Sequence, residues 1–392
     1  MLTNVGRLSL SRSGHTLSVV ATKAYIFGGT TAAEKLASND MHAVTLVSAE
    51  KPESAYSIVP AVPDIEGGRL PTARTKHAAC AFNVCVAVCG GVDESGELID
   101  DGSTIWLFNT AKSTWEFLEA PEAENRPGPR QDAKLFDHQN NLVLYGGVAS
   151  DGVALKDVWH FSYADRVWTR LPDAPVASHD AAVANGVLHL ISTNDSLSSD
   201  MHLLKLTPAK DELQEWHAVS FPTNALTPGP RPRNGGGLLP VSTGHGRHYL
   251  VYLFGAQQKP GTTGTPVAVT TSEPNEQSQT AAPLYWSDMW TYQLPSALPE
   301  VKATTSISDV IKPSKIKDSI RSALGYDSGQ HSWAEVEVLP PAELELAEGK
   351  VHPGPRGFFG SDMMKDGRSV IIWGGINAKG ETEGDGWIIR LE

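Results

Sequence analysis

The stretch Tyr25-Ile26-Phe27-Gly28-Gly29 places a glycine doublet directly after a short apolar run. This arrangement recurs in full as Ala87-Val88-Cys89-Gly90-Gly91, Leu144-Tyr145-Gly146-Gly147 and Ile372-Trp373-Gly374-Gly375. A fifth copy has decayed to Leu253-Phe254-Gly255-Ala256, and a sixth, Leu188-His189-Leu190-Ile191-Ser192, keeps the apolar run and loses both glycines. Copies spaced by roughly 50 to 60 residues indicate a repeat architecture, in which each unit needs its neighbours to bury its faces.

Each unit divides into four short strands separated by turn residues. In the first unit the predicted strands are 12–20, 24–27, 41–46 and 55–59. The sixth unit supplies only three, 358–363, 369–373 and 387–391, whereas residues 2–8 form a spare strand. Pairing this spare strand with the sixth unit would close a ring and remove exposed sheet edges.

Tryptophans recur at fixed places in these strands. Trp106 and Trp115 are nine residues apart, as are Trp159 and Trp168. The corresponding residues of other units are Trp216, Trp290, Trp333 and Trp387. A large flat ring at a constant offset is typical of packing between adjacent sheets, so these residues are predicted to belong to the core.

The pattern Arg-x-Gly-His, apolar run, Gly-Gly, an acidic or amide residue shortly before Trp and a second Trp about nine residues on resembles the Kelch repeat. Arg12-Ser13-Gly14-His15, Phe27-Gly28-Gly29, Lys156-Asp157-Val158-Trp159 and Trp168 carry the resemblance. The resemblance implies a six-bladed all-β propeller of four-stranded antiparallel blades, with the first strand of each blade nearest a central channel. We therefore expect residues 1–392 to form one domain.

Composition limits the functions that this domain can have. The 392 residues are 40% hydrophobic and 20% charged, which is ordinary for a globular protein. A formal net charge of −13 argues against nucleic acid or an anionic membrane as a partner. The N-terminal residues contain no signal-like apolar region, and the three cysteines are an odd number, so a cytoplasmic location is predicted. The sequence does not indicate an oligomeric state.

Arginine occupies an equivalent position at the start of the first strand in five units. These candidate ligand-binding residues are Arg12, Arg74, Arg130, Arg233 and Arg356. The fourth unit has Val176 there, and Arg231 competes with Arg233 for the register. Guanidinium groups ringing one mouth of the channel would suit a carboxylate, sulfate or phosphate. The alternative is that they bond backbone carbonyls of neighbouring blades and are structural.

Three histidines, His15, His77 and His179, share the position three residues after the arginine position and are further candidates for ligand contact. Three imidazoles can bind zinc, but these lie in the first, second and fourth units and do not cluster, so no metal and no cofactor are predicted. The sequence also lacks the nucleophile elbow, the H-E-x-x-H motif and the C-x-x-C motif.

The fifth unit contains two insertions. Residues 256–285 are rich in Thr, Pro, Gly, Ser and Gln and are predicted to be a flexible loop, either a simple expansion or a lid over the arginine mouth. Residues 296–330 include a predicted short helix at 314–324, which must dock on the propeller or on a partner. Its apolar stripe consists of Ile316, Ile320 and Leu324.

Two functional hypotheses follow. The first is a non-catalytic binding module that recognises a protein segment or a small acidic ligand at the arginine mouth. The Kelch resemblance supports it, because family adaptors that recognise acidic degrons and plant nitrile-specifier proteins both place arginines around such a mouth. The alternative is a small-molecule enzyme, a lyase or a metabolic tailoring activity, with its pocket at the same mouth.

Overall fold

The computed structural model describes residues 2–7, 10–46, 56–120, 125–192, 200–207, 212–221, 229–231, 233–244, 247–257, 284–295, 333–336, 350 and 352–391. Every regular element within these ranges is a strand. The strands form six four-stranded antiparallel sheets, which confirms the six-bladed propeller. The predicted helix at 314–324 and nearly all of the predicted loop at 256–285 lie outside the described residues.

The first three blades share one arrangement of strands. From the innermost strand outwards, blade 1 contains β3 (Thr16–Val20), β4 (Lys23–Phe27), β6 (Met41–Thr45) and β7 (Tyr56–Val59). Blade 2 contains β8 (Ala78–Phe82), β9 (Cys85–Cys89), β10 (Ile105–Asn109) and β11 (Thr114–Leu118) in the same order. Blade 3 contains β12 (Lys134–His138), β13 (Asn141–Tyr145), β14 (Val158–Ser162) and β15 (Val167–Leu171).

The second half of the ring repeats this arrangement. Blade 4 contains β16 (Ala181–Ala184), β17 (Val187–Ile191), β18 (Met201–Lys205) and β19 (Trp216–Val219). Blade 5 contains β21 (Gly237–Gly244), β22 (Arg247–Leu253), β24 (Met289–Gln293) and β25 (Trp333–Glu335). Blade 6 contains β27 (Gly360–Met363), β28 (Ser369–Trp373), β30 (Asp385–Arg390) and, outermost, β1 (Leu2–Arg7).

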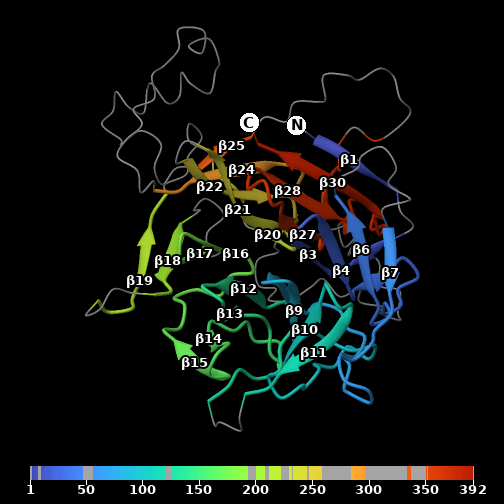
Figure 1. Cartoon of the computed structure of the whole chain (residues 1–392). Helices are drawn as coiled ribbons and strands as arrows, with labels where there is room; N and C mark the ends of the chain where they lie inside the picture. Colours follow the sequence, from blue (N-terminus) through green and yellow to red (C-terminus); the bar gives the residue numbers. More distant parts are fainter. Residues whose placement is uncertain are drawn as a thin grey trace, which may run out of the picture.

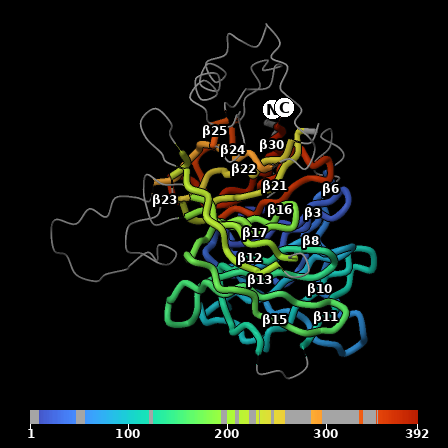
Figure 2. Tube along the Cα trace, turned by 90° about the vertical axis from the view of Figure 1, so that its left-hand side faces the viewer, coloured from blue at the N-terminus to red at the C-terminus, as the bar shows by residue number. Residues whose placement is uncertain are grey.

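The ring is closed by the N-terminal strand, as predicted. β1 pairs antiparallel with β30, with Leu2 opposite Ile389 and Arg7 opposite Asp385. Figures 1 and 2 both show the two termini side by side. In Figure 1 the outermost strands lie around the periphery, and the innermost strands surround the centre. Each innermost strand contacts the next one around the ring, and β27 returns to β3.

The core consists of six apolar clusters, each shared by two adjacent blades. The rings of Phe27 in blade 1 and Trp115 in blade 2, for example, have centroids 5.0 Å apart. The prediction that the repeat tryptophans are core residues is confirmed for all of them except Trp216, which is only partly buried. Its indole donates to the Pro172 carbonyl oxygen at 2.9 Å.

The predicted first strands are wrong in one respect, because the arginine does not belong to the same strand as the residues that line the channel. The predicted strand 12–20 is broken into β2 (Arg12–Ser13) and β3, and 358–363 begins only at Gly360 after β26 (Arg356–Gly357). The break occurs where Gly14 and Phe358 have positive φ values of 62° and 59°. β2 pairs instead with β5 (Thr30–Thr31), and β26 with β29 (Ile376–Asn377). β20 (Arg233–Asn234) and β23 (Ala256–Gln257) form the same small ladder in blade 5.

Candidate functional site

The five repeat arginines are buried where the innermost strands begin. Arg74, Arg233 and Arg356 are 0% exposed, and Arg12 and Arg130 are 6% and 4% exposed. In every case Nη1 donates at 2.9 to 3.0 Å to the carbonyl oxygen just beyond the second strand of its own blade. The acceptors are Gly28, Gly90, Gly146, Phe254 and Gly374. The structural alternative is wrong about the acceptors, which belong to the arginine's own blade and not to a neighbouring blade. Ligand binding by these side chains stays a prediction.

Four of the five guanidinium groups also bind an aspartate of their own blade. The nearest N···O distances of these pairs are 2.7 to 2.8 Å. The pairs are Arg74–Asp101, Arg130–Asp157, Arg233–Asp288 and Arg356–Asp385. Each aspartate also accepts from the indole of a repeat tryptophan, so the polar residue before Trp in the repeat serves to hold the arginine.

Burial alone would raise the pKa of Asp157, Asp288 and Asp385. The hydrogen bonds and charges of their arginines outweigh that cost and lower the pKa of each carboxyl below its usual value. These pairs are therefore ionised, and their charges are satisfied within the protein.

Blade 1 uses a different partner. Arg12 Nη2 donates at 2.5 Å to Nε2 of His42, and Nδ1 of His42 lies 2.6 Å from the Tyr56 hydroxyl. Because an arginine can only donate, His42 must be neutral here. Burial and the charge of Arg12 lower the His42 pKa to about 4, which agrees with this arrangement.

The glycine doublets join neighbouring blades. The second residue of a doublet donates its N–H to the carbonyl of the arginine in the next blade, for example Gly29 to Arg74 at 2.9 Å and Gly375 to Arg12 at 2.8 Å. Gly28 has a φ of 61°, and a Cβ atom there would collide with the Arg74 carbonyl oxygen. In blade 5 the first glycine position is taken by Phe254, which keeps a positive φ of 53°. The doublet therefore has a backbone role, because glycine adopts a positive φ and allows the neighbouring blade to approach closely.

The three candidate histidines do not form one site. Nε2 of His15 accepts from the Gly360 N–H at 3.2 Å, and Nε2 of His77 lies 2.7 Å from the Thr16 hydroxyl. Burial, followed by the charges of Arg12 and Arg74 respectively, lowers the pKa of His15 to about 3 and that of His77 well below its usual value. These two neutral rings therefore connect adjacent blades. His179 is half-buried and lines the channel.

The channel mouth is formed by the residues at the strand breaks. Gly14, Lys76, Asp132, Gly235 and Phe358 occupy equivalent positions and all have φ values of 55° to 62°. Their backbones form a relay around the mouth, in which Asp132 donates to Lys76, Lys76 to Gly14, Gly14 to Phe358 and Phe358 to Gly235, at 2.7 to 2.9 Å. In blade 4 the N–H of Ser178 donates instead to the Tyr145 hydroxyl, at 3.0 Å.

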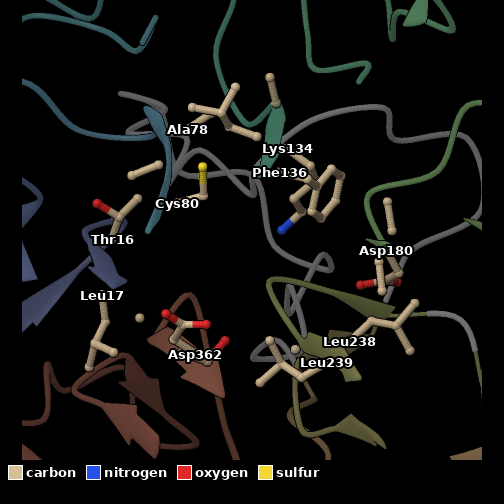
Figure 3. Close-up of a pocket in the computed structure, with 18 of the residues that line it drawn as sticks. Thr16, Leu17, Ala78, Cys80, Lys134, Phe136, Asp180, Leu238, Leu239 and Asp362 are labelled. Atoms are coloured by element: carbon tan, nitrogen blue, oxygen red, sulfur yellow. The ribbon is translucent and has the colours of Figure 1, made fainter. Parts of the chain in front are cut away.

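Below this relay the channel encloses a cavity of about 420 Å³, lined by all six innermost strands. Figure 3 shows that its polar groups come from different blades. They include Thr16 of β3, Cys80 of β8, Lys134 of β12, Asp180 just before β16 and Asp362 of β27. Sequence reasoning missed these residues, although all five lie four or six positions after the aligned arginine or its blade 4 equivalent, Val176.

The charged side chains gather on the wall built by blades 2, 3 and 4. Asp132 lies close enough to Lys76, His179 and Lys134 for their charges to act on it, but burial prevails and raises its pKa. Asp180 is 2% exposed and accepts from the Tyr252 hydroxyl at 2.5 Å, and burial raises its pKa as well. The opposite wall at this level contains Gly14, Gly235, Gly236, Gly237, Phe358 and Gly360. The mouth therefore has one charged wall and one wall without charges.

Comparison with protein families identifies the fold. Residues 14–255 match the model of the KLHDC2/KLHL20/DRC7 Kelch-repeats domain. The chain belongs to this Kelch family.

Curated relatives of this Kelch chain have diverse names. It is 24% identical over 173 residues to N-(sulfonatooxy)prop-2-enimidothioate sulfolyase of Thlaspi arvense. This match covers 43% of this chain and 46% of the relative. It is 33% identical over 96 residues to tRNA wybutosine-synthesizing protein 4 of Aspergillus fumigatus, a match that covers 23% of this chain and 9% of that relative. The dynein alpha chain of the Chlamydomonas reinhardtii flagellar outer arm is 23% identical to this chain over 174 residues, a match that covers 43% of this chain and 4% of the dynein chain. The chain spans less than half the length of each of these relatives.

Among solved structures, the one titled "Structure of YjhT" superposes with a TM-score of 0.60 at 13% identity, covering 98% of this chain and 97% of that one. This similarity concerns the fold alone. Within the described ranges, His, Cys, Asp and Glu side chains form no group that could hold a metal ion. No helix in the described part of the chain is long and apolar enough to cross a membrane.

Proposed function

We propose that this Kelch propeller is a binding module that takes up the anionic group of a small ligand through the mouth of its channel. Lys134, and not the five arginines, is its principal cationic contact. The arginines are already bound to carbonyls and carboxylates of their own blades. Lys134 is the first residue of β12 and follows the relay residue Asp132 by two positions. Its side chain points into the cavity (Figure 3).

One observation carries this proposal. Within the described part of the chain, the Lys134 ammonium makes neither a hydrogen bond nor an ion pair, although it is half-buried in the channel. A cation removed from bulk water and left without an acceptor is costly, so an anion that enters the cavity gains that interaction. A carboxylate, a sulfate and a phosphate share this chemistry.

The size of the cavity limits how much of a ligand can enter. About 420 Å³ is within the usual range of small-molecule sites. A free metabolite fits inside, whereas a protein partner could insert only an acidic side chain or a chain end. Both sources present the same anionic group to Lys134.

The test compares Lys134→Met with Lys23→Met, which removes an exposed lysine from β4. Ligand-observed NMR would measure binding of pentanoate, pentyl sulfate, pentyl phosphate and a short acetylated and amidated peptide with one glutamate. We expect at least one probe to bind the wild type and Lys23→Met equally, and to bind Lys134→Met at least tenfold more weakly. The proposal fails if all four probes leave the wild type unbound, or if Lys134→Met binds as well as wild type.

A second candidate function is a lyase that acts on a sulfated substrate in the same cavity. It is favoured by the similarity to a protein named as a sulfolyase whose named substrate carries a sulfonatooxy group. Such a group is an anion that Lys134 could hold. Release of inorganic sulfate from an O-sulfated thiohydroximate by the wild type, and its loss in Lys134→Met, would support this function. Absence of sulfate release from the purified protein would contradict it.

A further inference from the structure

Asp362 presents a carboxylate to the cavity from the side opposite Lys134. It lies on β27 of blade 6, and Lys134 lies on β12 of blade 3, three blades away in a ring of six. Figure 3 shows the two side chains entering the cavity from opposite sides. Lys134 is four residues after Arg130 and Asp362 is six after Arg356, so Asp362 lies roughly 6 to 7 Å further along the channel at 3.3 Å per residue.

The surroundings of Asp362 contain donors but no cation. Its Oδ2 accepts from the Val19 N–H at 2.6 Å, and its Oδ1 accepts from the Met363 N–H at 2.7 Å. It takes part in no ion pair with any residue that the structure describes. Burial raises its pKa to about 6, and only these two backbone donors oppose that shift. Its charge is therefore not neutralised within the described chain.

Other groups at this depth add to the demand for a cation. Asp137 also lines the cavity, and its pKa is raised by burial. The Cys80 thiol is partly exposed to the channel, and its pKa is raised first by burial and then by the charge of Asp137. A purely anionic ligand that filled the cavity would bring its negative charge towards the carboxylates of Asp137 and Asp362.

We propose that the ligand is zwitterionic, with an anionic group at Lys134 and an ammonium or guanidinium group at Asp362. This inference rests on the proposed function, because it assumes that the channel is a ligand site. The charges of Asp132 and Asp180 act on Lys134 without a bond to it. A zwitterion supplies a directly bonded partner to Lys134 and to Asp362 at the same time, whereas a plain acid supplies only one. A metal ion is a poorer partner for Asp362, since the described residues offer it no further ligands of the required kind.

The experiment uses ω-amino acids from 3-aminopropanoate to 8-aminooctanoate as probes. Each is compared with the carboxylic acid and with the amine of the same chain length, by ligand-observed NMR. In the wild type we expect one chain length of the zwitterion to bind at least tenfold more tightly than either matched probe. This comparison needs no variant, so it stands even where a substitution impairs folding.

Two variants assign the subsites. Asp362→Asn should abolish the advantage of the zwitterion without weakening binding of the acid, whereas Glu94→Gln, which removes an exposed loop charge, should change neither. If acids bind through Lys134 but the zwitterion has no advantage, or keeps it in Asp362→Asn, the zwitterion inference is overturned and the proposed function survives. If neither acids nor zwitterions bind the wild type, both fail.

Discussion

At the scale of single residues, each of the five repeat arginines donates to a carbonyl oxygen of its own blade. A guanidinium is a good anion ligand only when its donors are available, and those of Arg356 are directed at the Gly374 carbonyl and both oxygens of Asp385. Pairing of this kind matters because a buried charge without a partner is far more costly than an exposed one. Replacing an exposed arginine should therefore lower the free energy of unfolding much less than replacing a buried one.

Replacing Arg356 by Met should therefore lower the free energy of unfolding by about 3 to 5 kcal/mol, because Asp385, 3% exposed, would lose its bonds to Arg356 and keep as a described cationic partner Lys350, whose Nζ lies 3.6 Å from its Oδ2. The matched control is Arg69→Met, since Arg69 is about half exposed and paired with the exposed Glu119. Its loss should cost less than about 1 kcal/mol. Denaturant unfolding followed by tryptophan fluorescence measures both, and equal losses would show that the Arg356–Asp385 pair does not stabilise the blade.

The same residues show how far sequence could predict the site. The recurrence of arginine at one position was visible, but recurrence does not distinguish a ligand contact from a repeated structural bond. The acceptors of Arg130 and Arg233, Asp157 and Asp288, are 27 and 55 residues away in sequence, so only the folded blade reveals that these donors are used. Lys134 could not be predicted from recurrence, because no other blade has a lysine at the equivalent position.

At the scale of elements, the glycine doublet is the joint between blades, and its requirement is steric. Gly28→Ala should destabilise the protein by about 2 to 5 kcal/mol, since the new Cβ adds a collision with the Arg74 carbonyl to the cost of a positive φ. Gly96 has a φ of 82°, and no atom lies within 4 Å of the position that a Cβ would take there. Gly96→Ala should therefore cost only the conformational term, roughly 1 to 2 kcal/mol. Thermal unfolding of the two variants measures the difference, and equal shifts would mean that contact between blades does not require glycine.

The strands themselves were predictable, because alternating apolar runs between turn residues specify them locally. The strand breaks were not. At Lys76 and Phe358 the chain adopts a positive φ with side chains that do not favour it. The hydrogen bonds between blades impose this conformation, and they bring together residues far apart in sequence, such as Gly14 and Phe358.

At the scale of the whole molecule, the N-terminal strand completes blade 6 and so couples the two ends of the chain. Removing residues 2–7 should lower the melting temperature and promote aggregation, because β30 would become an exposed edge. The lost backbone hydrogen bonds contribute about 0.5 to 1.5 kcal/mol each. Differential scanning calorimetry with light scattering would measure both effects.

The antiparallel register indicates how the loss can be reversed. Leu2 lies opposite Ile389, so the start of β1 is next to the end of β30, and a short hairpin could join them. A variant in which residues 2–7 are moved behind residue 391 through an inserted Asn-Gly pair, so that residues 390 and 391 and this pair form a four-residue loop between Ile389 and Leu2, should regain most of the wild-type melting temperature. A variant carrying the same residues in scrambled order should not. If both variants recover equally, added length and not strand pairing accounts for the effect, and ring closure by β1 would not be what stabilises the propeller.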